Sequence, residues 1–431
     1  MRPSRKVRVV FINDTARNGG PGRSLESILK FLDPDVVHRA VVLPREGAVA
    51  DLLAGSHVTD RLHFEPNLVE NPIEPWGRAI ERHDFEVGLS LKALRGMGNV
   101  VKAVGAVARL RSLVRRERYD LLYCNGTSAD FAGAVVARLT GVPALWHVRY
   151  TSIPDPLRRL HRRLSKSAEV ARIICVSKAA ASLFPHCMDK VSVIHNGLDV
   201  DAFDPARIHG TLRAELGLPS NAIVFGGHGR VLRRKGYVEM IRAARIALDR
   251  MTEDERRSLY FVIVGDTPED FRPDHVEECR ALAAQMGIAN HVRMLGFRSD
   301  VRSLVIDFDV EVVPSVYADP LPRAVIEAMS FGKPVIAFDT GGVAEMIETG
   351  LTGELVAFEH AEGGCDGASA RAVDHLADAF VRYARDPRLR ERQGRAGRER
   401  VVRDFDARVH ARRIQDEIVV ASGLFESQHR R

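Results

Sequence analysis

The sequence has few cysteines, no long apolar run and no strong excess of one charge. No CxxC pair or His–Cys spacing suggests a zinc site or a disulfide framework. The N-terminal stretch MRPSRKVRVVFIND has an apolar run too short for a signal-peptide core or a membrane span. These absences favour a protein of the reducing cytoplasm. The five cysteines are Cys124, Cys175, Cys187, Cys279 and Cys365.

The charge balance is mildly basic, with 63 Lys and Arg against 57 Asp and Glu and a formal charge of +6. This small excess suits an anionic ligand or a membrane surface, and it gives no reason to expect nucleic acid as a partner. The 431 residues are 45% hydrophobic and 28% charged, as expected of an ordinary globular protein with two or three domains.

Strand and helix patterns alternate along the N-terminal half. A buried-strand pattern over 7–12 is followed by Gly19, Gly20 and Gly22, which predict a turn, and by a helical pattern over 23–32. LLYCN, ALWHV, IICVS and VSVIHN add further strands. This alternation predicts an α/β fold with a parallel sheet and helices on both faces.

The alternation restarts after an irregular stretch from Gly197 to about Pro219. AIVFGGHGR, YFVIVGD, VRMLGF, VEVVPS and PVIAFD predict a second parallel sheet. We therefore expect an N-terminal domain over 1–197, a C-terminal domain over 198–400, and a helical extension over 401–431 that packs on the domains. The stretch 61–99 has weak periodicity and several prolines, so it is predicted only to be an insertion or a mobile cover.

Two acids stand eight positions apart in DPLPRAVIEAMSFGKPV. Proline and glycine bracket a predicted helix over 322–331, which leaves Asp319 in the preceding loop and Glu327 inside the helix. At about 1.5 Å rise per residue, the two acids differ in height and can address two parts of one elongated ligand. The helix start offers backbone N–H groups to a phosphate. The donor-binding residues expected there are Leu321, Pro322 and Arg323.

Upstream, GGHGRVLRRKG places Arg230 and Lys235 in a glycine-rich loop that follows a predicted strand. Two cations near a helix N-terminus predict a diphosphate ligand. Because Arg and Lys neutralise the charge that develops on a departing diphosphate, such a site needs no metal, and we expect none.

These motifs, together with FVIVGD, VRMLGF and VIHNGLDVDAF, resemble in order and spacing the retaining glycosyltransferases of family 4. The resemblance covers nearly the whole chain and is strongest between Val191 and Val356. It implies the GT-B fold, which consists of two facing Rossmann-like domains with parallel sheets.

The resemblance also implies a role for each motif residue. Asp319 would hold the transferred sugar, Glu327 the ribose of the nucleotide, and Arg230 and Lys235 the diphosphate. His147 in WHVR matches a histidine near the sugar. The family usually has Glu where this chain has Asp319, which is shorter by one methylene and leaves the identity of the sugar open.

Two further segments would contact the donor. The turn at Gly19, Gly20 and Gly22 corresponds to the place where the two domains close on the diphosphate and the acceptor. The nucleotide base would be bound largely through backbone near Phe297 and Arg298.

The implied reaction transfers a hexose-type sugar from a nucleoside-diphosphate sugar, the co-substrate, to an acceptor hydroxyl with retention. Family members use front-face attack, in which the departing phosphate helps to deprotonate the acceptor. No protein nucleophile is needed, unlike in retaining glycosidases, whose two carboxyl groups lie about 5 Å apart. The acceptor would be a saccharide or a lipid-linked sugar in polysaccharide, glycolipid or other glycoconjugate biosynthesis.

Simpler interpretations exist for each feature. Alone, the acids would be a helix cap and a solvated carboxylate, the cations surface charges, and His147 a core residue. GGHGR imitates a dinucleotide fingerprint, but Leu232 occupies the position of the third glycine, so we reject a nicotinamide cofactor. Asp-x-Asp triplets arise often by chance. They occur at Asp199/Asp201, Asp307/Asp309 and Asp404/Asp406.

The helical pattern DPLRRLHRRLSKS puts Leu157, Leu160 and Leu164 on one stripe surrounded by arginines. The simpler interpretation is a core-facing stripe with a solvated basic face. The alternative is peripheral contact with anionic lipid at the inner face of the membrane.

Two other functions remain open at this point. A sugar-nucleotide 2-epimerase of the same fold would form product with no acceptor present. A nucleotide-sugar-binding protein without turnover would bind the donor and neither transfer nor hydrolyse it.

Overall fold

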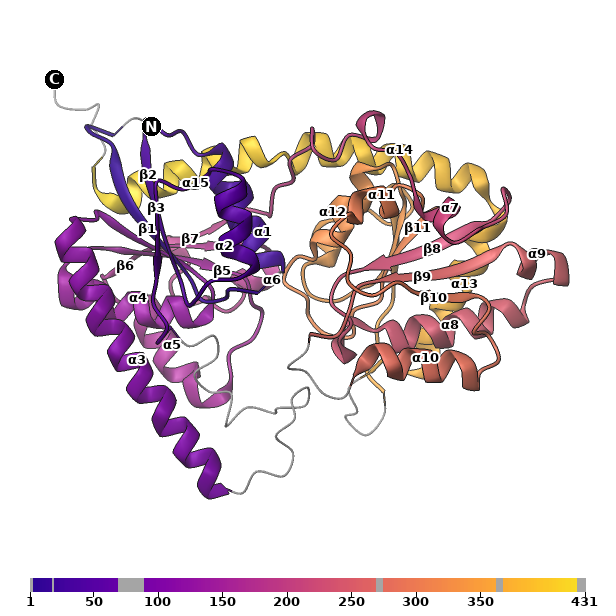
Figure 1. Ribbon diagram of the computed structural model, residues 1–431, viewed down its shortest axis with the longest axis horizontal. Helices are drawn as coiled ribbons and strands as arrows, with labels where there is room; N and C mark the ends of the chain where they lie inside the picture. The colour runs from indigo at the N-terminus through magenta and orange to yellow at the C-terminus, as the bar shows by residue number, and fades with distance from the viewer. Residues whose placement is uncertain (1–2, 18, 69–88, 269–273, 362–366, 425–431) are drawn as a thin grey trace. The chain divides into compact units, whose positions relative to one another are not determined.

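The computed structural model describes residues 3–17, 19–68, 89–268, 274–361 and 367–424 (Figure 1). The described residues form two compact units, each with its own sheet. Residues 198–406 belong to the second unit, and the described residues before and after them belong to the first. Within the ranges that the structure describes, no helix is long and apolar enough to cross a membrane.

The sheet of the first unit has seven parallel strands in the order β3-β2-β1-β4-β5-β6-β7. The order reverses between β1 and β4, and in open parallel sheets ligands bind outside the carboxyl ends of the strands at such a reversal. The strands are β1 (Val7–Asn13), β2 (Val37–Leu43), β3 (Arg61–Phe64), β4 (Leu121–Asn125), β5 (Ala144–Val148), β6 (Val170–Cys175) and β7 (Val191–Val193).

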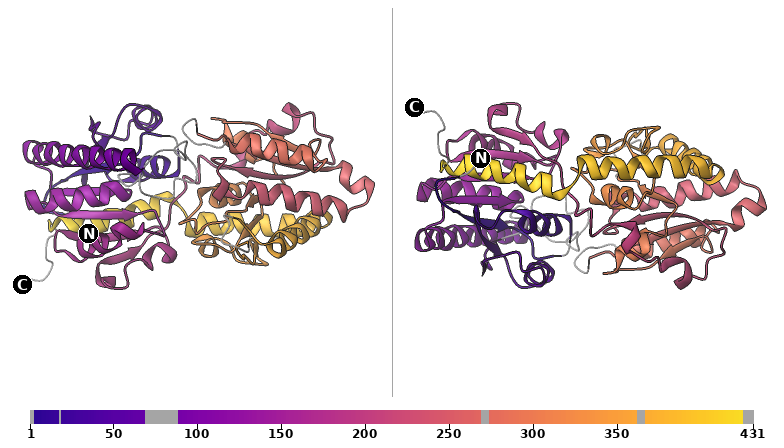
Figure 2. Two further views of the ribbon diagram at one scale, coloured as in Figure 1. Left: turned by 90° about the horizontal axis from the view of Figure 1, so that it is seen from below. Right: turned by 90° about the horizontal axis from the view of Figure 1, so that it is seen from above.

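Helices cover both faces of this sheet (Figures 1 and 2). Helix α1 begins at Gly20, three residues before the predicted start, because Pro21 is compatible with a first helical turn. The last helix, α15, packs on α1. The helices are α1 (Gly20–Phe31), α2 (Ala48–Gly55), α3 (Leu89–Glu117), α4 (Thr127–Thr140), α5 (Asp155–Lys166), α6 (Lys178–Ala181), the 3-10 helix η1 (Met188–Lys190) and α15 (Ala407–Ser422).

The stretch 61–99, predicted only as an insertion or a mobile cover, contributes to the first unit at both ends. Arg61–Phe64 is the edge strand β3, which pairs with β2, and α3 begins at Leu89. The pattern missed β3 because four residues are too few to show a period. The middle of the stretch, 69–88, lies outside the described residues.

The sheet of the second unit has six parallel strands in the order β10-β9-β8-β11-β12-β13, and it reverses between β8 and β11. Its core contains Phe225, Phe261 and Phe380, whose ring centroids lie 5.0–5.5 Å apart. The strands are β8 (Ile223–His228), β9 (Leu259–Val264), β10 (Val292–Met294), β11 (Val310–Val313), β12 (Val335–Phe338) and β13 (Gly353–Val356).

Helices α8, α10 and α13 share one apolar core with the strands, and α12 packs against α14. The helices are η2 (Pro205–Arg207), α7 (Leu212–Glu215), η3 (Arg233–Lys235), α8 (Tyr237–Asp249), α9 (Glu253–Arg257), α10 (His275–Gln285), α11 (Val301–Val305), α12 (Arg323–Ser330), η4 (Val343–Glu345), α13 (Ala370–Arg385) and α14 (Pro387–Asp404).

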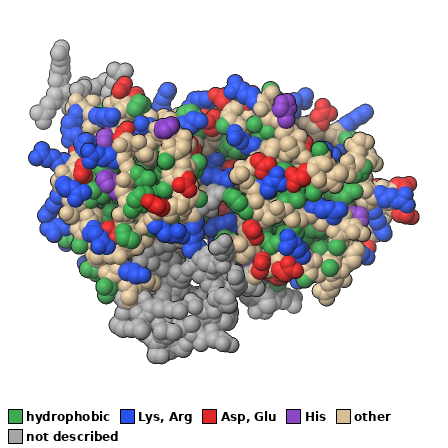
Figure 3. All heavy atoms as spheres, in the orientation of Figure 1, with side chains coloured by type: hydrophobic (Ala, Val, Ile, Leu, Met, Phe, Trp, Pro, Cys, Tyr) green, Lys and Arg blue, Asp and Glu red, His purple; other side chains and the backbone are tan. Residues whose placement is uncertain are grey.

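Within the described residues, neither the surface charge nor the cysteines indicate a special site. Basic and acidic side chains are interspersed over the face drawn in Figure 3, as expected from the small net charge. Four cysteines lie in the described part of the chain, and all are buried and free.

Candidate active site

Two loops meet at the reversal point of the second sheet. One follows β8 and carries Arg230 to Lys235, and the other follows β11 and leads through Asp319 into α12. Gly236 has a φ of +75°, and a Cβ at this position would lie 1.7 Å from the carbonyl oxygen of Pro314. Only glycine permits this close approach, so Gly236 brings the two predicted halves of the site together.

The structure joins the first predicted acid to one of the predicted cations. Lys235 Nζ lies 2.6 Å from Asp319 Oδ2, and the two side chains are 22% and 7% exposed. Burial acts to lower the pKa of Lys235, but the Asp319 carboxylate outweighs it and the pKa is raised. Arg230 is close enough for its charge to oppose that rise. The Lys235 ammonium also lies 5.6 Å from the centre of the Tyr317 ring.

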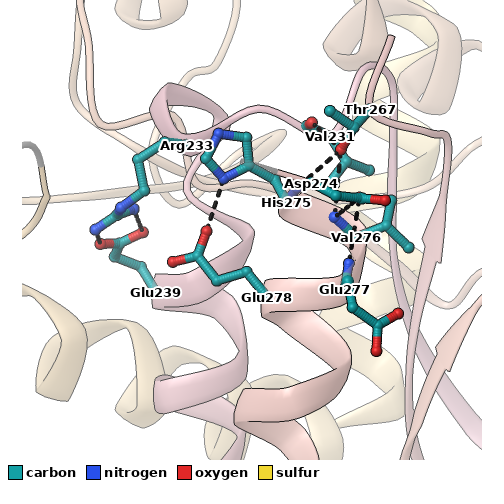
Figure 4. A network of polar contacts seen from close by, with 9 residues as sticks. All are labelled: Val231, Arg233, Glu239, Thr267, Asp274, His275, Val276, Glu277 and Glu278. Atoms are coloured by element: carbon teal, nitrogen blue, oxygen red, sulfur yellow. Dashed lines mark hydrogen bonds and ion pairs between the residues drawn. The ribbon is translucent and has the colours of Figure 1, made fainter. Parts of the chain in front are cut away.

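A polar network makes hydrogen bonds to the loop after β8 (Figure 4). Arg233 donates to both oxygens of the buried Glu239 carboxylate at 2.6 and 2.8 Å. Thr267 Oγ1 donates to the carbonyl oxygen of Val231 at 3.0 Å and accepts from the backbone N–H of His275 at 3.1 Å. These contacts fix the backbone that presents Arg230 and Lys235.

The second acid, Glu327, is 4% exposed and lies on α12. Its Oε1 accepts from Arg323 Nε at 3.0 Å, one helical turn earlier, and its Oε2 contacts His228 Nε2 at 3.0 Å. The helix begins after Pro322, which offers no side-chain cap. The N-cap position of this helix therefore supplies no side-chain cap to the first turn.

The sequence did not predict His228 and Glu311 as part of this site. His228 ends β8, and its Nδ1 lies 2.9 Å from Oε1 of Glu311, which is fully buried in β11. Burial acts to lower the pKa of His228, but the carboxylates of Glu311 and Glu327 raise it to about 10. Burial raises the pKa of Glu311. A signal was present in VEVVPS, because a charged residue inside a central apolar strand is rarely buried without a partner.

The predicted donor contacts at Phe297, Arg298 and Leu321 lie in the same unit. Phe297 is 60% exposed, whereas Leu321 is 4% exposed. Arg298 is held by Glu215 at 2.6 Å and Asp300 at 2.7 Å, so its guanidinium is engaged within the protein.

His147, the histidine predicted near the sugar, lies one residue before the end of β5 in the first unit and is 2% exposed. Its Nδ1 lies 2.5 Å from Tyr123 Oη and 3.4 Å from Arg149 Nη2. Because a guanidinium can only donate, Nδ1 accepts and Nε2 carries the proton of the neutral ring. Burial and Arg149 hold the pKa of His147 well below its usual value. Nε2 has no hydrogen-bond partner among the described residues.

His147 lines a cavity of about 10 Å³ with Ser27, His195 and Asn196. This volume holds about one water molecule and is too small for a sugar. The buried Ser27 Oγ likewise lacks a hydrogen-bond partner in the described structure.

The predicted glycine turn is the start of α1. Gly19 precedes the helix, Gly20 begins it, and Gly22 is buried within its first turn. A Cβ on Gly22 would lie 2.6 Å from Cγ2 of Val49 on α2. Close packing of α1 on α2 is therefore one physical reason for glycine at this position.

The Asp-x-Asp triplets make contacts within the fold. Asp309 Oδ2 lies 2.6 Å from Arg213 Nη2, and Asp307 Oδ2 accepts from the Arg213 backbone at 3.2 Å. Asp199 Oδ1 accepts from the backbone of Asp201 at 3.2 Å. Over the described ranges, no group of three or more His, Cys, Asp or Glu side chains is placed to hold a metal ion.

Two family models match the chain. The model of glycosyl transferases group 1 matches residues 209–400, which contain the site in the second unit, and that of glycosyltransferase family 4 matches residues 75–202. The chain belongs to the family 4 glycosyltransferases of group 1.

One curated relative of this glycosyltransferase comes from Escherichia coli and is 25% identical over 333 residues, which cover 74% of this chain and 80% of the relative. Its name is UDP-Gal:alpha-D-GlcNAc-diphosphoundecaprenol alpha-1,3-galactosyltransferase. D-inositol 3-phosphate glycosyltransferase of Streptomyces avermitilis is 31% identical over 299 residues, covering 64% and 60%. The aligned part thus spans less than two thirds of the second relative.

A solved structure of similar fold is Anabaena HepE in complex with UDP and glucose. It has a TM-score of 0.73 and 23% identity, and the match covers 95% of this chain and 98% of HepE. Together with the two parallel sheets, this likeness gives the chain the GT-B fold of two Rossmann-like domains.

Proposed function

We propose that this glycosyltransferase transfers a sugar from a nucleoside-diphosphate sugar to an acceptor hydroxyl, with retention at the anomeric carbon and without a metal. The observation that carries the proposal is the cluster at the reversal of the second sheet. There Lys235 contacts Asp319 at 2.6 Å, Arg230 lies close enough to affect the pKa of Lys235, and Glu327 follows on α12. The cluster combines positive charge for a diphosphate with carboxylates for hydroxyl groups.

In the proposed reaction, Arg230 and Lys235 bind the diphosphate and stabilise the negative charge that grows as the glycosidic bond breaks. Asp319 accepts a hydrogen bond from the sugar, and Glu327 accepts from the ribose. The acceptor hydroxyl attacks on the face that the diphosphate leaves, and a phosphate oxygen takes its proton. The two cations supply the charge that a metal ion would otherwise provide.

We further propose that the acceptor is a saccharide or a lipid-linked sugar, in cytoplasmic biosynthesis of a polysaccharide, glycolipid or other glycoconjugate. The Escherichia coli relative is named for a diphosphoundecaprenol-linked acceptor, which supports the lipid-linked form. The Streptomyces relative is named for D-inositol 3-phosphate, so the family does not restrict the acceptor to lipids.

Peripheral contact with anionic lipid is proposed for α5. Of the three leucines predicted to form a core-facing stripe, Leu160 is 46% exposed, and the buried side of the helix instead contains His161 and Ser165. An exposed leucine among exposed arginines suits an interfacial helix. Vesicle flotation with and without phosphatidylglycerol, at low and high salt, tests this contact. Binding that is absent or insensitive to salt contradicts it.

The first test of the donor site is a thermal-shift screen with EDTA present, using UDP, GDP, ADP and CMP and their common sugar derivatives. UDP is the natural first probe because HepE was solved with UDP and glucose. Stabilisation by one diphosphate nucleotide supports a metal-free donor site and selects the sugars to test for transfer. If no nucleotide stabilises the protein, or if only added divalent metal restores the effect, the proposed donor site is wrong.

A further inference from the structure

Three buried side chains form a line that ends at Glu327, the carboxylate proposed to bind ribose. Glu311 comes from the middle of β11, His228 from the end of β8 and Glu327 from α12, and their side chains are 0%, 6% and 5% exposed. Nδ1 of the ring lies 2.9 Å from one carboxylate and Nε2 lies 3.0 Å from the other. A single imidazole therefore connects two strands and the helix that carries Glu327.

The contacts on both sides of the ring favour an imidazolium between these carboxylates. A neutral ring has one nitrogen lone pair, which would face a carboxylate oxygen on one side. The Nδ1 contact is an ion pair without hydrogen-bond alignment, and the backbone N–H of His228 also donates to the same Glu311 oxygen at 3.3 Å. The raised pKa of His228, about 10, agrees with a charged ring at neutral pH.

The charges around the ring alternate in sign. Glu311 and Glu327 are acids, His228 and Arg323 are bases, and Arg323 lies 3.0 Å from the second oxygen of Glu327. The buried Tyr237 on α8 is also close to this group, because burial and then the charge of Glu311 raise the pKa of its hydroxyl. The charges of these four groups sum to zero, so the group as a whole can stay buried. Each charged side chain is stabilised by the opposite charge of its neighbour.

This arrangement is costly as a purely structural device. Oε2 of Glu311 has no hydrogen-bond partner in the described part of the chain. The other residues of β11 are buried valines, and a buried ion pair seldom stabilises a fold more than apolar residues of similar size. Residues that break a local packing rule in this way are found mostly at functional sites.

The line determines the direction of the Glu327 carboxylate. His228 takes one lone pair of Oε2 and Arg323 takes one of Oε1, which fixes the plane of the group. An ionised carboxylate can accept about four hydrogen bonds, so its contacts with His228 and Arg323 do not by themselves prevent a further one from a ligand hydroxyl. We propose that His228 and Glu311 are positioning residues, which act through Glu327 to orient its carboxylate toward the hydroxyl groups of the nucleotide. This inference rests on the proposed donor site.

The test compares Glu311→Gln and His228→Gln with Glu278→Gln. The control removes the charge from another His–Glu contact of the same unit, His275 Nδ1 to Glu278 Oε2 at 2.7 Å, in which only the histidine is buried and the Glu278 side chain is 40% exposed (Figure 4). Affinity for UDP is measured by calorimetry between pH 6 and 9, in EDTA. The pKa of His228 is measured by NMR, and its signal is identified as the one missing from the His228→Gln spectrum.

Wild type is expected to bind UDP with little change over this range, because the ring stays charged until about pH 10. In Glu311→Gln the ring loses its charge within the range, so UDP affinity falls by about tenfold as pH rises. His228→Gln binds about tenfold more weakly than wild type at every pH, and Glu278→Gln matches wild type. The His228→Leu/Glu311→Leu variant is expected to keep the thermal stability of the protein and to lose the same affinity.

Each contrary result has one meaning. If wild type binds UDP and Glu311→Gln binds it equally with an unchanged pH profile, the positioning role is wrong while the donor site stands. If wild type binds none of the diphosphate nucleotides, the proposed function fails and the positioning role fails with it. A His228 pKa that does not fall in Glu311→Gln shows that the ion pair does not hold the ring in its charged form.

Discussion

Replacing Lys235 with Met tests the contact at the centre of the proposed site. The side chain of Asp319 is 7% exposed, and its Oδ2 lies 2.6 Å from the ammonium that the substitution removes. Methionine keeps the length and apolar stem of lysine, so the main change is the loss of the charge. The carboxylate is then left in a poorly hydrated place without its cation.

The expected cost follows from how far each partner is buried. Breaking a fully buried ion pair by removing one partner costs about 3–5 kcal/mol. Since the Lys235 side chain is 22% exposed, water can replace part of the contact, and we expect about 2 kcal/mol. For a unit of about 200 residues this lowers the melting temperature by about 4–8 °C.

The effect on transfer is larger than the effect on stability. If the ammonium meets the departing diphosphate, its loss removes a contact that strengthens in the transition state, and kcat/KM falls by roughly 10²-fold or more. The control is Arg280→Met. Arg280 is a cation of the same unit that is 52% exposed and lies 3.4 Å from Glu277. It is expected to change neither stability nor transfer.

The assay is a double-mutant cycle of Lys235→Met and Asp319→Asn. Urea unfolding gives the stability of each variant, and the cycle is expected to show a coupling of about 1–2 kcal/mol. Transfer is measured with the donor selected by the thermal-shift screen. Additive effects on stability would refute the contact, and transfer within about threefold of wild type in Lys235→Met would refute its role at the diphosphate.

Three further predictions use positions with built-in controls. Gly341 has a φ of +57°, and a Cβ there would lie 2.3 Å from the backbone oxygen of Asp319, so Gly341→Ala should lower transfer at least tenfold. Gly350 has a φ of +84° but open space around it, so Gly350→Ala should lower only the melting temperature. Gly22→Ala should cost about 1–3 kcal/mol in urea unfolding, whereas Gly55→Ala should cost nothing. The pKa of His228 is about 10 when folded and about 6.5 when unfolded, so its stabilisation is full below pH 6.5 and is lost toward pH 10. The stability difference between wild type and His228→Gln should therefore shrink over that range, and a constant difference would contradict the charged ring.

Local patterns predicted the elements that carry the site. The strands LLYCN and ALWHV have the bounds that the structure gives to β4 and β5. Helix α12, Arg323–Ser330, lies within the predicted range, because proline and glycine on either side end it. The pattern was less accurate for VSVIHN, where only Val191–Val193 pairs as β7.

Local patterns could not predict which polar residues come into contact in the fold. His228 and Glu311 are 83 positions apart, and they meet because β8 and β11 are neighbours in the sheet. The resemblance to family 4 predicted a ribose contact for their partner Glu327, but nothing in the sequence showed that a buried histidine would contact it. Contacts of this kind depend on the order of the strands in the sheet, and the periodicity of apolar residues does not predict that order.

The contact between Lys235 and Asp319 changes how the two motifs work together. The resemblance to family 4 predicted that the cation contacts the diphosphate and the acid contacts the sugar, as separate contacts, whereas the structure pairs the two side chains at 2.6 Å. A diphosphate that approaches Lys235 competes with Asp319 for the same ammonium. Donor binding would therefore weaken the ion pair and free an oxygen of Asp319 to accept a hydrogen bond from the sugar. We infer that the two groups bind the donor as one coupled unit, so that replacing either one changes what the other can do.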